Sequence, residues 1–159
     1  QIARYDKIHL FGFRKGEESY DESLSIKPGA ATASVFEAPF GRVGLSICYD
    51  LRFPELFRAM GDVALIAVPS AFTYTTGSAH WEILLRARAV ENQCYVLAPA
   101  QGGRHENGRR TWGHSMLIDP WGEVVACLPE GEGCVLGDID LVRLEETRLA
   151  LPALKHRTM

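Results

Sequence analysis

The sequence predicts an α/β protein in which a layered sheet carries helices on one side. Apolar runs of strand length recur along the chain, and several are continuous rather than alternating, as in strands buried on both faces. Two segments with helical spacing separate the first three runs, and further strands follow. No internal repeat is visible, so a single domain over residues 1–159 is predicted.

Six apolar runs are predicted to be strands because of their length and composition. The Pro-Trp-Gly turn at 120–122 connects two of them and favours an antiparallel hairpin at that point. The six runs are residues 42–47, 63–68, 94–100, 114–119, 123–128 and 134–140.

Two helices are expected between the first three strands. The first covers about 54–60, because Pro54 is tolerated in an opening turn and Gly61 ends the segment. The second covers 79–92, where apolar side chains recur at helical spacing and Ser78 can cap the first turn.

The remaining segments are assigned by composition. A short helix is expected around 141–149. Residues 11–30 and 102–111 are polar and contain glycine, so both are predicted to be loops. Loops of this length often carry functional residues.

The composition argues against nucleic-acid and membrane partners. Seventeen Lys and Arg stand against 20 Asp and Glu, the net charge is -3, and the basic residues are scattered. The longest apolar stretch is interrupted by Pro69, well short of the roughly 20 residues of a membrane span. The first residues lack the basic flank and apolar centre of a signal peptide, so a cytoplasmic location is predicted.

The cysteines are expected to be reduced. They are far apart in the sequence and include no CxxC spacing, which argues against a disulfide framework and a thiol-based metal site. The four are Cys48, Cys94, Cys127 and Cys134.

Cys48 lies where the strand 42–47 ends and a helix begins. This corner belongs to the carboxyl edge of the sheet, where α/β proteins bind ligands. The following helix start favours a thiolate, and the backbone N–H of Tyr49 could hold an oxyanion. A small residue that only fills buried space remains the alternative, since free cysteine is often buried.

Several long motifs resemble one family. Residues 41–56, "GRVGLSICYDLRFPEL", resemble the nucleophile region of the nitrilase superfamily, the carbon-nitrogen hydrolases, and "YDKIHLF" (5–11) resembles its lysine motif. Segments 69–101 and 113–126 resemble the parts that follow. The resemblance implies an α-β-β-α layered sandwich, of which this chain is the central and C-terminal part. Because the chain also begins without Met, an N-terminal portion is expected to be missing.

The resemblance also implies catalytic roles. Cys48 matches the nucleophile that forms a thioester, Lys7 matches the lysine of a Glu-Lys-Cys triad, and Glu22 matches a second glutamate that orients the lysine or assists proton transfer. The general-base glutamate of the family lies upstream of the lysine motif, outside this chain. The fragment alone is therefore expected to be defective in turnover.

Two segments, 69–81 and 100–116, most resemble the deaminated glutathione amidase branch, which cleaves N-(4-oxoglutaryl)-cysteinylglycine. Another ω-amidase or an N-carbamoyl hydrolase is the alternative within the superfamily. A non-catalytic fragment or subunit is the alternative from another class. The resemblance implies a small-molecule amide substrate and a homodimer or higher homo-oligomer.

Residues near the predicted strand ends are candidates for the substrate site. Phe72 and Thr73 follow the strand 63–68 and are predicted to line it. Arg52 and Glu55 have the spacing of a structural ion pair.

A basic loop and five histidines complete the candidates. The loop can receive substrate carboxylates, or it is simply solvated. The histidines have no ligand-like spacing, so no metal is predicted, and the chemistry needs no organic cofactor. The basic loop comprises Arg104, His105, Arg109 and Arg110.

Overall fold

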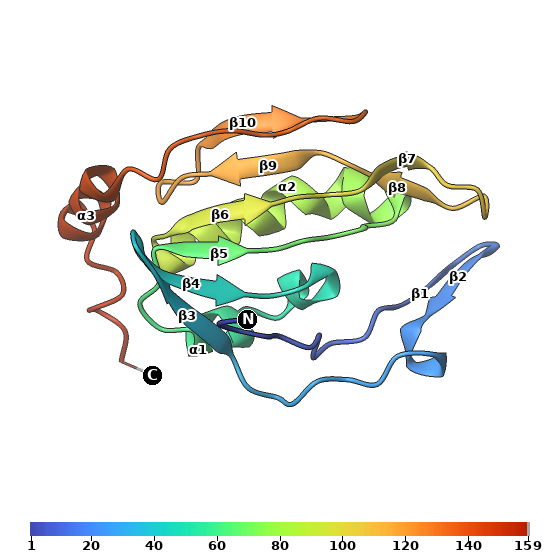
Figure 1. Cartoon of the computed structure of the whole chain (residues 1–159), viewed down its shortest axis with the longest axis horizontal. Coiled ribbons are helices and arrows are strands. Elements are labelled where there is room, and N and C mark those ends of the chain that lie inside the picture. Colours follow the sequence, from blue (N-terminus) through green and yellow to red (C-terminus); the bar gives the residue numbers. More distant parts are fainter. Residues whose placement is uncertain (159) are drawn as a thin grey trace.

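One six-stranded sheet organises the protein, whose computed structural model describes residues 1–158. Its strand order is β10-β9-β6-β5-β4-β3 (Figure 1). The three central strands β4, β5 and β6 are parallel, and the three outer strands pair antiparallel with their neighbours. The strands are β3 Ser34–Ala38, β4 Gly41–Leu45, β5 Leu65–Ala67, β6 Tyr95–Ala98, β9 Ser115–Ile118 and β10 Val124–Leu128.

Three helices pack against the sheet. The first, α1 Pro54–Ala59, begins at the predicted proline, and α3 Leu141–Ala150 matches its predicted range. The longest, α2 Tyr74–Asn92, starts earlier than predicted because the Thr73 side chain accepts a hydrogen bond from the N–H of Thr76 at 3.3 Å.

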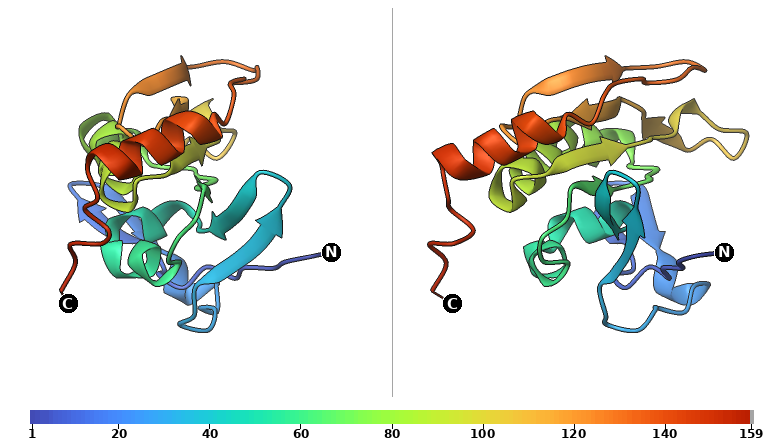
Figure 2. Two further views of the ribbon diagram at one scale, coloured as in Figure 1. Left: turned by 90° about the vertical axis from the view of Figure 1, so that its left-hand side faces the viewer. Right: turned by 60° about the vertical axis from the view of Figure 1, so that its left-hand side comes forward.

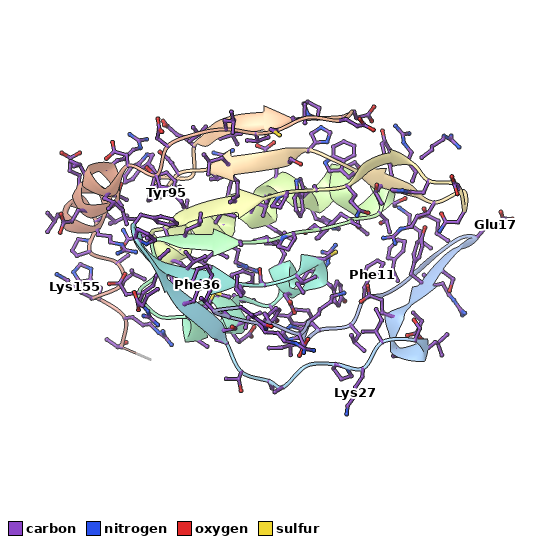
Figure 3. All side chains as sticks on the ribbon, viewed as in Figure 1. Phe11, Glu17, Lys27, Phe36, Tyr95 and Lys155 are labelled. Carbon is purple, nitrogen blue, oxygen red and sulfur yellow. The ribbon has the colours of Figure 1, made fainter. Side chains whose placement is uncertain are left out.

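The two faces of the sheet carry different helices. Ile66 and Val96 belong to the core cluster with α1 and α2, whereas the adjacent Leu65 and Tyr95 belong to a second cluster with Leu144 of α3. The prediction of helices on one side is therefore wrong for α3. This helix covers the other face, at the end opposite both hairpins (Figures 1 and 2), and Tyr95 lies beside it in Figure 3.

Two hairpins stand where loops were predicted. They are β1 Gly12–Lys15 with β2 Glu18–Asp21, and β7 Gly102–Arg104 with β8 Arg110–Trp112. Both lie at the end of the molecule toward which β4, β5 and β6 point (Figure 1). The first hairpin is attached to the start of α2, because Thr75 Oγ1 donates a hydrogen bond to Glu18 at 2.8 Å.

The segment 134–140 is not a strand, contrary to the prediction. Its Val135 and Ile139 pack on the cluster that contains Leu117. A Cβ at Gly137 would lie 2.4 Å from Leu117 Cδ2, so a larger residue here would displace the Leu117 side chain. The apolar residues of the segment thus cover the face of the sheet instead of pairing at its edge. Among residues 1–158, no helix is long and apolar enough to cross a membrane.

Candidate active site

Cys48 lies at the carboxyl end of β4, as predicted. Its N–H donates to the carbonyl of Pro69 at 3.0 Å, which extends the pairing of β4 beyond the strand. The backbone then turns into the 3-10 helix η2 Cys48–Arg52, with Cys48 itself at φ 52. A non-glycine residue in this left-handed region is strained, and such strain is typical of functional positions.

A cavity of about 440 Å³ opens beside the half-buried Cys48. Its wall includes every site residue that the sequence predicted, from four separate parts of the chain. That these residues lie together does not test the role of each one, so the individual roles stay predictions. These residues are Lys7, Glu22, Cys48, Tyr49, Phe72 and Thr73.

Lys7 and Glu22 form an ion pair in this wall. The Lys7 side chain is only 9% exposed, and Glu22 Oε2 also accepts a hydrogen bond from the N–H of Phe11 at 2.7 Å. The chain after Glu22 returns along the lysine segment, where Gly29 donates to the Lys7 carbonyl at 2.8 Å. A Cβ at Gly29 would lie 2.1 Å from the carbonyl oxygen of Asp6, so only glycine fits there.

The environment raises the pKa of the Cys48 thiol above its usual 9.0. Burial is the largest cause, since it disfavours the thiolate. A hydrogen bond from the backbone of Ala71 and the charges of Lys7 and Arg109 lower the pKa, while Glu22 raises it. This raised pKa favours the neutral thiol, which differs from the thiolate expected at this corner.

Asp50 fixes the geometry of the site and was missed by the sequence analysis. Its carboxylate is completely buried and accepts hydrogen bonds from the hydroxyl of Tyr5 at 2.8 Å, the N–H of His9 at 3.1 Å and the N–H of Ile47 at 2.9 Å. It also bonds the His9 ring at 2.8 Å. Asp50 thus joins the lysine segment to the cysteine corner. A sequence signal existed, namely an acidic residue inside an apolar corner.

The predicted lining residues differ in what they offer a ligand. Thr73 is buried, and its hydroxyl is already used by Thr76, so it shapes the wall more than it binds. Phe72 presents a ring over which the guanidinium of Arg52 lies at 5.4 Å. The expected pairing of Arg52 with Glu55 is wrong, because Arg52 contacts Nδ1 of His80 at 3.3 Å instead.

Only one residue of the basic loop reaches the cavity. Arg109 belongs to the wall, whereas Arg110 lies over the Tyr74 ring at 3.7 Å and pairs with Glu130. His105 bonds the hydroxyl of Thr111. Within residues 1–158, no group of three His, Cys, Asp or Glu side chains is arranged to hold a metal ion.

Residues 1–149 match the carbon-nitrogen hydrolase family, and the chain belongs to this family. Deaminated glutathione amidase of Bos taurus is 49% identical over 98% of this chain and 48% of its own length. The same enzyme of Yersinia enterocolitica is 48% identical over 97% of this chain and 55% of its own length. The chain thus spans about half the length of the curated relatives it matches.

Solved structures agree with this assignment. The NitFhit protein of C. elegans superposes with a TM-score of 0.86 at 48% identity, covering 97% of this chain and 38% of that chain. Saccharomyces cerevisiae Nit3, a member of branch 10 of the nitrilase superfamily, gives a TM-score of 0.81 at 35% identity. The match covers 96% of this chain and 54% of that chain. The predicted family and the nitrilase-like α/β fold are confirmed.

Proposed function

We propose that the complete protein containing this chain is a thiol amidohydrolase, specifically a deaminated glutathione amidase. It hydrolyses N-(4-oxoglutaryl)-cysteinylglycine to 2-oxoglutarate and cysteinylglycine. The observation that carries the proposal is the strained Cys48 beside the Lys7–Glu22 pair in one cavity. The amidases of the same name that are 48–49% identical to this chain support the choice of substrate.

In the proposed reaction, Cys48 Sγ attacks the amide carbon and forms a tetrahedral oxyanion. Lys7 and the backbone N–H of Tyr49 stabilise the negative oxygen. The C–N bond then breaks, and the amine leaves with the proton released by the thiol. Water hydrolyses the resulting thioester, which yields the acid and restores the thiol.

Proton transfer assigns a separate role to Glu22. Its Oε2 is engaged by Lys7 and by the N–H of Phe11, so this carboxylate positions the ammonium group. The base that takes the Cys48 proton is the glutamate expected upstream of the lysine motif. Because burial raises the pKa of Cys48, the reaction depends on that base.

Mass spectrometry of the complete protein tests this function. After incubation with deaminated glutathione and rapid acid quenching, we expect a 4-oxoglutaryl adduct on the peptide that contains Cys48, and none in Cys48→Ala. Steady-state rates on an N-carbamoyl amino acid form the comparison. An adduct on another residue, or faster turnover of the carbamoyl compound, would contradict the proposal.

We further propose a cytoplasmic homodimer. The exposed thiols of Cys127 and Cys134 suit a reducing compartment.

The expected interface combines residues 52–60 and 80–92 with the tail from 151, whose last residue Met159 lies outside the described part. Exposed Ile83 on α2, 68% accessible, supports this surface. Ile83→Asp is expected to give monomers by light scattering, and cell fractionation tests the location.

A further inference from the structure

We propose that Arg109 binds a carboxylate group of the substrate, so that this site selects anionic amides. The inference rests on the proposed function and deepens it, because it assigns substrate selection to a residue of the β7–β8 hairpin. Sequence patterns left Arg109 undecided between ligand binding and solvation.

Arg109 is connected to the sulfur of Cys48 through the backbone of Ala71. Its Nη2 donates to the carbonyl of Ala71 at 2.6 Å, and the backbone of the same Ala71 bonds the sulfur of Cys48. The guanidinium carbon lies 5.2 Å from the centre of the Tyr20 ring in the other hairpin. These contacts hold the guanidinium in one orientation at the mouth of the cavity.

One donor of this guanidinium has no acceptor. Nε of Arg109 is buried and makes no hydrogen bond with any atom of residues 1–158. A buried N–H without an acceptor is unfavourable, and an incoming carboxylate oxygen relieves it with a charge-assisted hydrogen bond. With Nη2 bonded to the Ala71 carbonyl, Nε and Nη1 are the nitrogens that remain to donate to a ligand.

The charge of the cavity favours an anion. Three cationic side chains, Lys7, Arg52 and Arg109, face a single carboxylate, Glu22. Lys7 is paired with Glu22, and across the described residues neither arginine has a carboxylate within ion-pair distance. Even with the base glutamate expected upstream of the lysine motif, three cations face two carboxylates, so an amide with a carboxylate group neutralises positive charge that a neutral amide leaves uncompensated.

Arg109 is favoured over Arg52 as the carboxylate ligand. Arg52 already shares its guanidinium with His80 and lies over the rings of Tyr49 and Phe72. Burial also lowers the pKa of Arg52. Arg109 alone among the two combines a fixed orientation with a buried free donor.

The first experiment compares deaminated glutathione with its dimethyl ester on the complete protein. Arg109→Gln is expected to lower kcat/KM for the acid by about 10- to 100-fold, mostly through KM, with little change for the ester. Arg109→Lys retains the charge but lacks the planar guanidinium with several N–H donors, so an intermediate decrease in kcat/KM for the acid is expected. Arg110→Gln is the matched control, because it removes the same charge one residue away and outside the cavity.

An equal loss on acid and ester in Arg109→Gln would overturn the proposal, as would an equal effect of Arg110→Gln. A thermal melt of each variant separates these outcomes from misfolding. If wild-type protein hydrolyses neither compound, the proposed function fails, and the second experiment then decides the role of Arg109.

The second experiment measures alkylation of Cys48 without turnover. Iodoacetate carries a carboxylate and iodoacetamide does not, so the ratio of their rates reports carboxylate binding beside the sulfur. We expect Arg109→Gln to lower this ratio about tenfold and Arg110→Gln to leave it unchanged. The same ratio in wild type and Arg109→Gln would overturn the proposal.

Discussion

At the scale of single residues, the reactivity of Cys48 depends on opposing influences. Burial and the charge of Glu22 raise the pKa of the thiol, whereas the Ala71 backbone, Lys7 and Arg109 lower it. Burial has the largest effect, so the sulfur stays protonated until a base acts or the solution becomes alkaline. Among the neighbouring charges, Lys7 and Arg109 oppose the effect of burial on the pKa, whereas Glu22 adds to it.

The pH dependence of Cys48 alkylation tests these signs. Lys7→Met removes a charge that lowers the pKa of Cys48, so the midpoint of the iodoacetamide rate against pH is expected to rise. Glu22→Gln removes a charge that raises the pKa, and the midpoint is expected to fall. Shifts of the same sign in both variants would contradict the assigned influences.

At the scale of elements, Asp50 connects two segments of the chain. Its two oxygens hold Tyr5 and His9 of the lysine segment together with Ile47, which follows β4. The Lys7 ammonium consequently stays near the cysteine corner although the two are 41 residues apart.

Asp50→Asn is expected to lower the free energy of unfolding by about 2–4 kcal/mol, because an amide cannot accept all of these hydrogen bonds and its NH₂ group meets donors. Urea unfolding of the complete protein measures the loss. Asp6→Asn is the control: this carboxylate is exposed and pairs only with Arg4, so a change within about 0.5 kcal/mol is expected. Equal losses of unfolding free energy in the two variants would contradict the proposal that Asp50 holds the two segments together.

Much of the sheet could be predicted because its strands are locally apolar. Strands β5, β6, β9 and β10 fall inside predicted runs, and β4 begins one residue before its run. The segment 134–140 misled the prediction, because side chains that pack onto a sheet face have the same composition as a strand. Strand β3 and the hairpins were missed, because their pairing depends on distant partners.

The candidate site was predictable where a motif or the end of a predicted strand identified the residues. Cys48, Lys7 and Glu22 were named from the sequence, and the structure brings them to one cavity. Asp50 was missed although an acidic residue inside an apolar corner was a signal, and Arg109 was left undecided, because burial and contacts between distant segments decide what both residues do. The protonation of Cys48 likewise depends on its burial in the folded chain.

At the scale of the whole molecule, stability at high pH depends on a thiol outside the site. Cys94 is fully buried in the main core cluster, and burial raises its pKa from 9.0 to about 12. A raised pKa means that the folded state holds the proton more tightly than the unfolded state. The stabilisation is complete below about pH 9 and is lost as the pH rises toward 12.

Cys94→Ala separates packing from protonation. At pH 7 we expect the variant to be less stable by about 1–2 kcal/mol, because a buried sulfur is lost. Between pH 9 and 12 the free energies of unfolding of the variant and the wild type are expected to approach each other. The wild type loses the stabilisation from its protonated Cys94, whereas alanine does not titrate. Chemical unfolding across this range measures both, and Cys134→Ala, at an exposed position, is expected to follow the wild type. If the difference in the free energy of unfolding between Cys94→Ala and wild type did not change with pH, titration of Cys94 would not contribute to stability.

The two hairpins have an evolutionary consequence. The reacting sulfur belongs to a corner of the parallel strands, whereas Tyr20 and Arg109 are contributed by separate two-stranded arms. Under the proposed function, sequence drift or recombination in these arms would alter which amide is accepted while the corner that carries the sulfur stays unchanged. Such a division would let one hydrolytic scaffold diversify through its periphery.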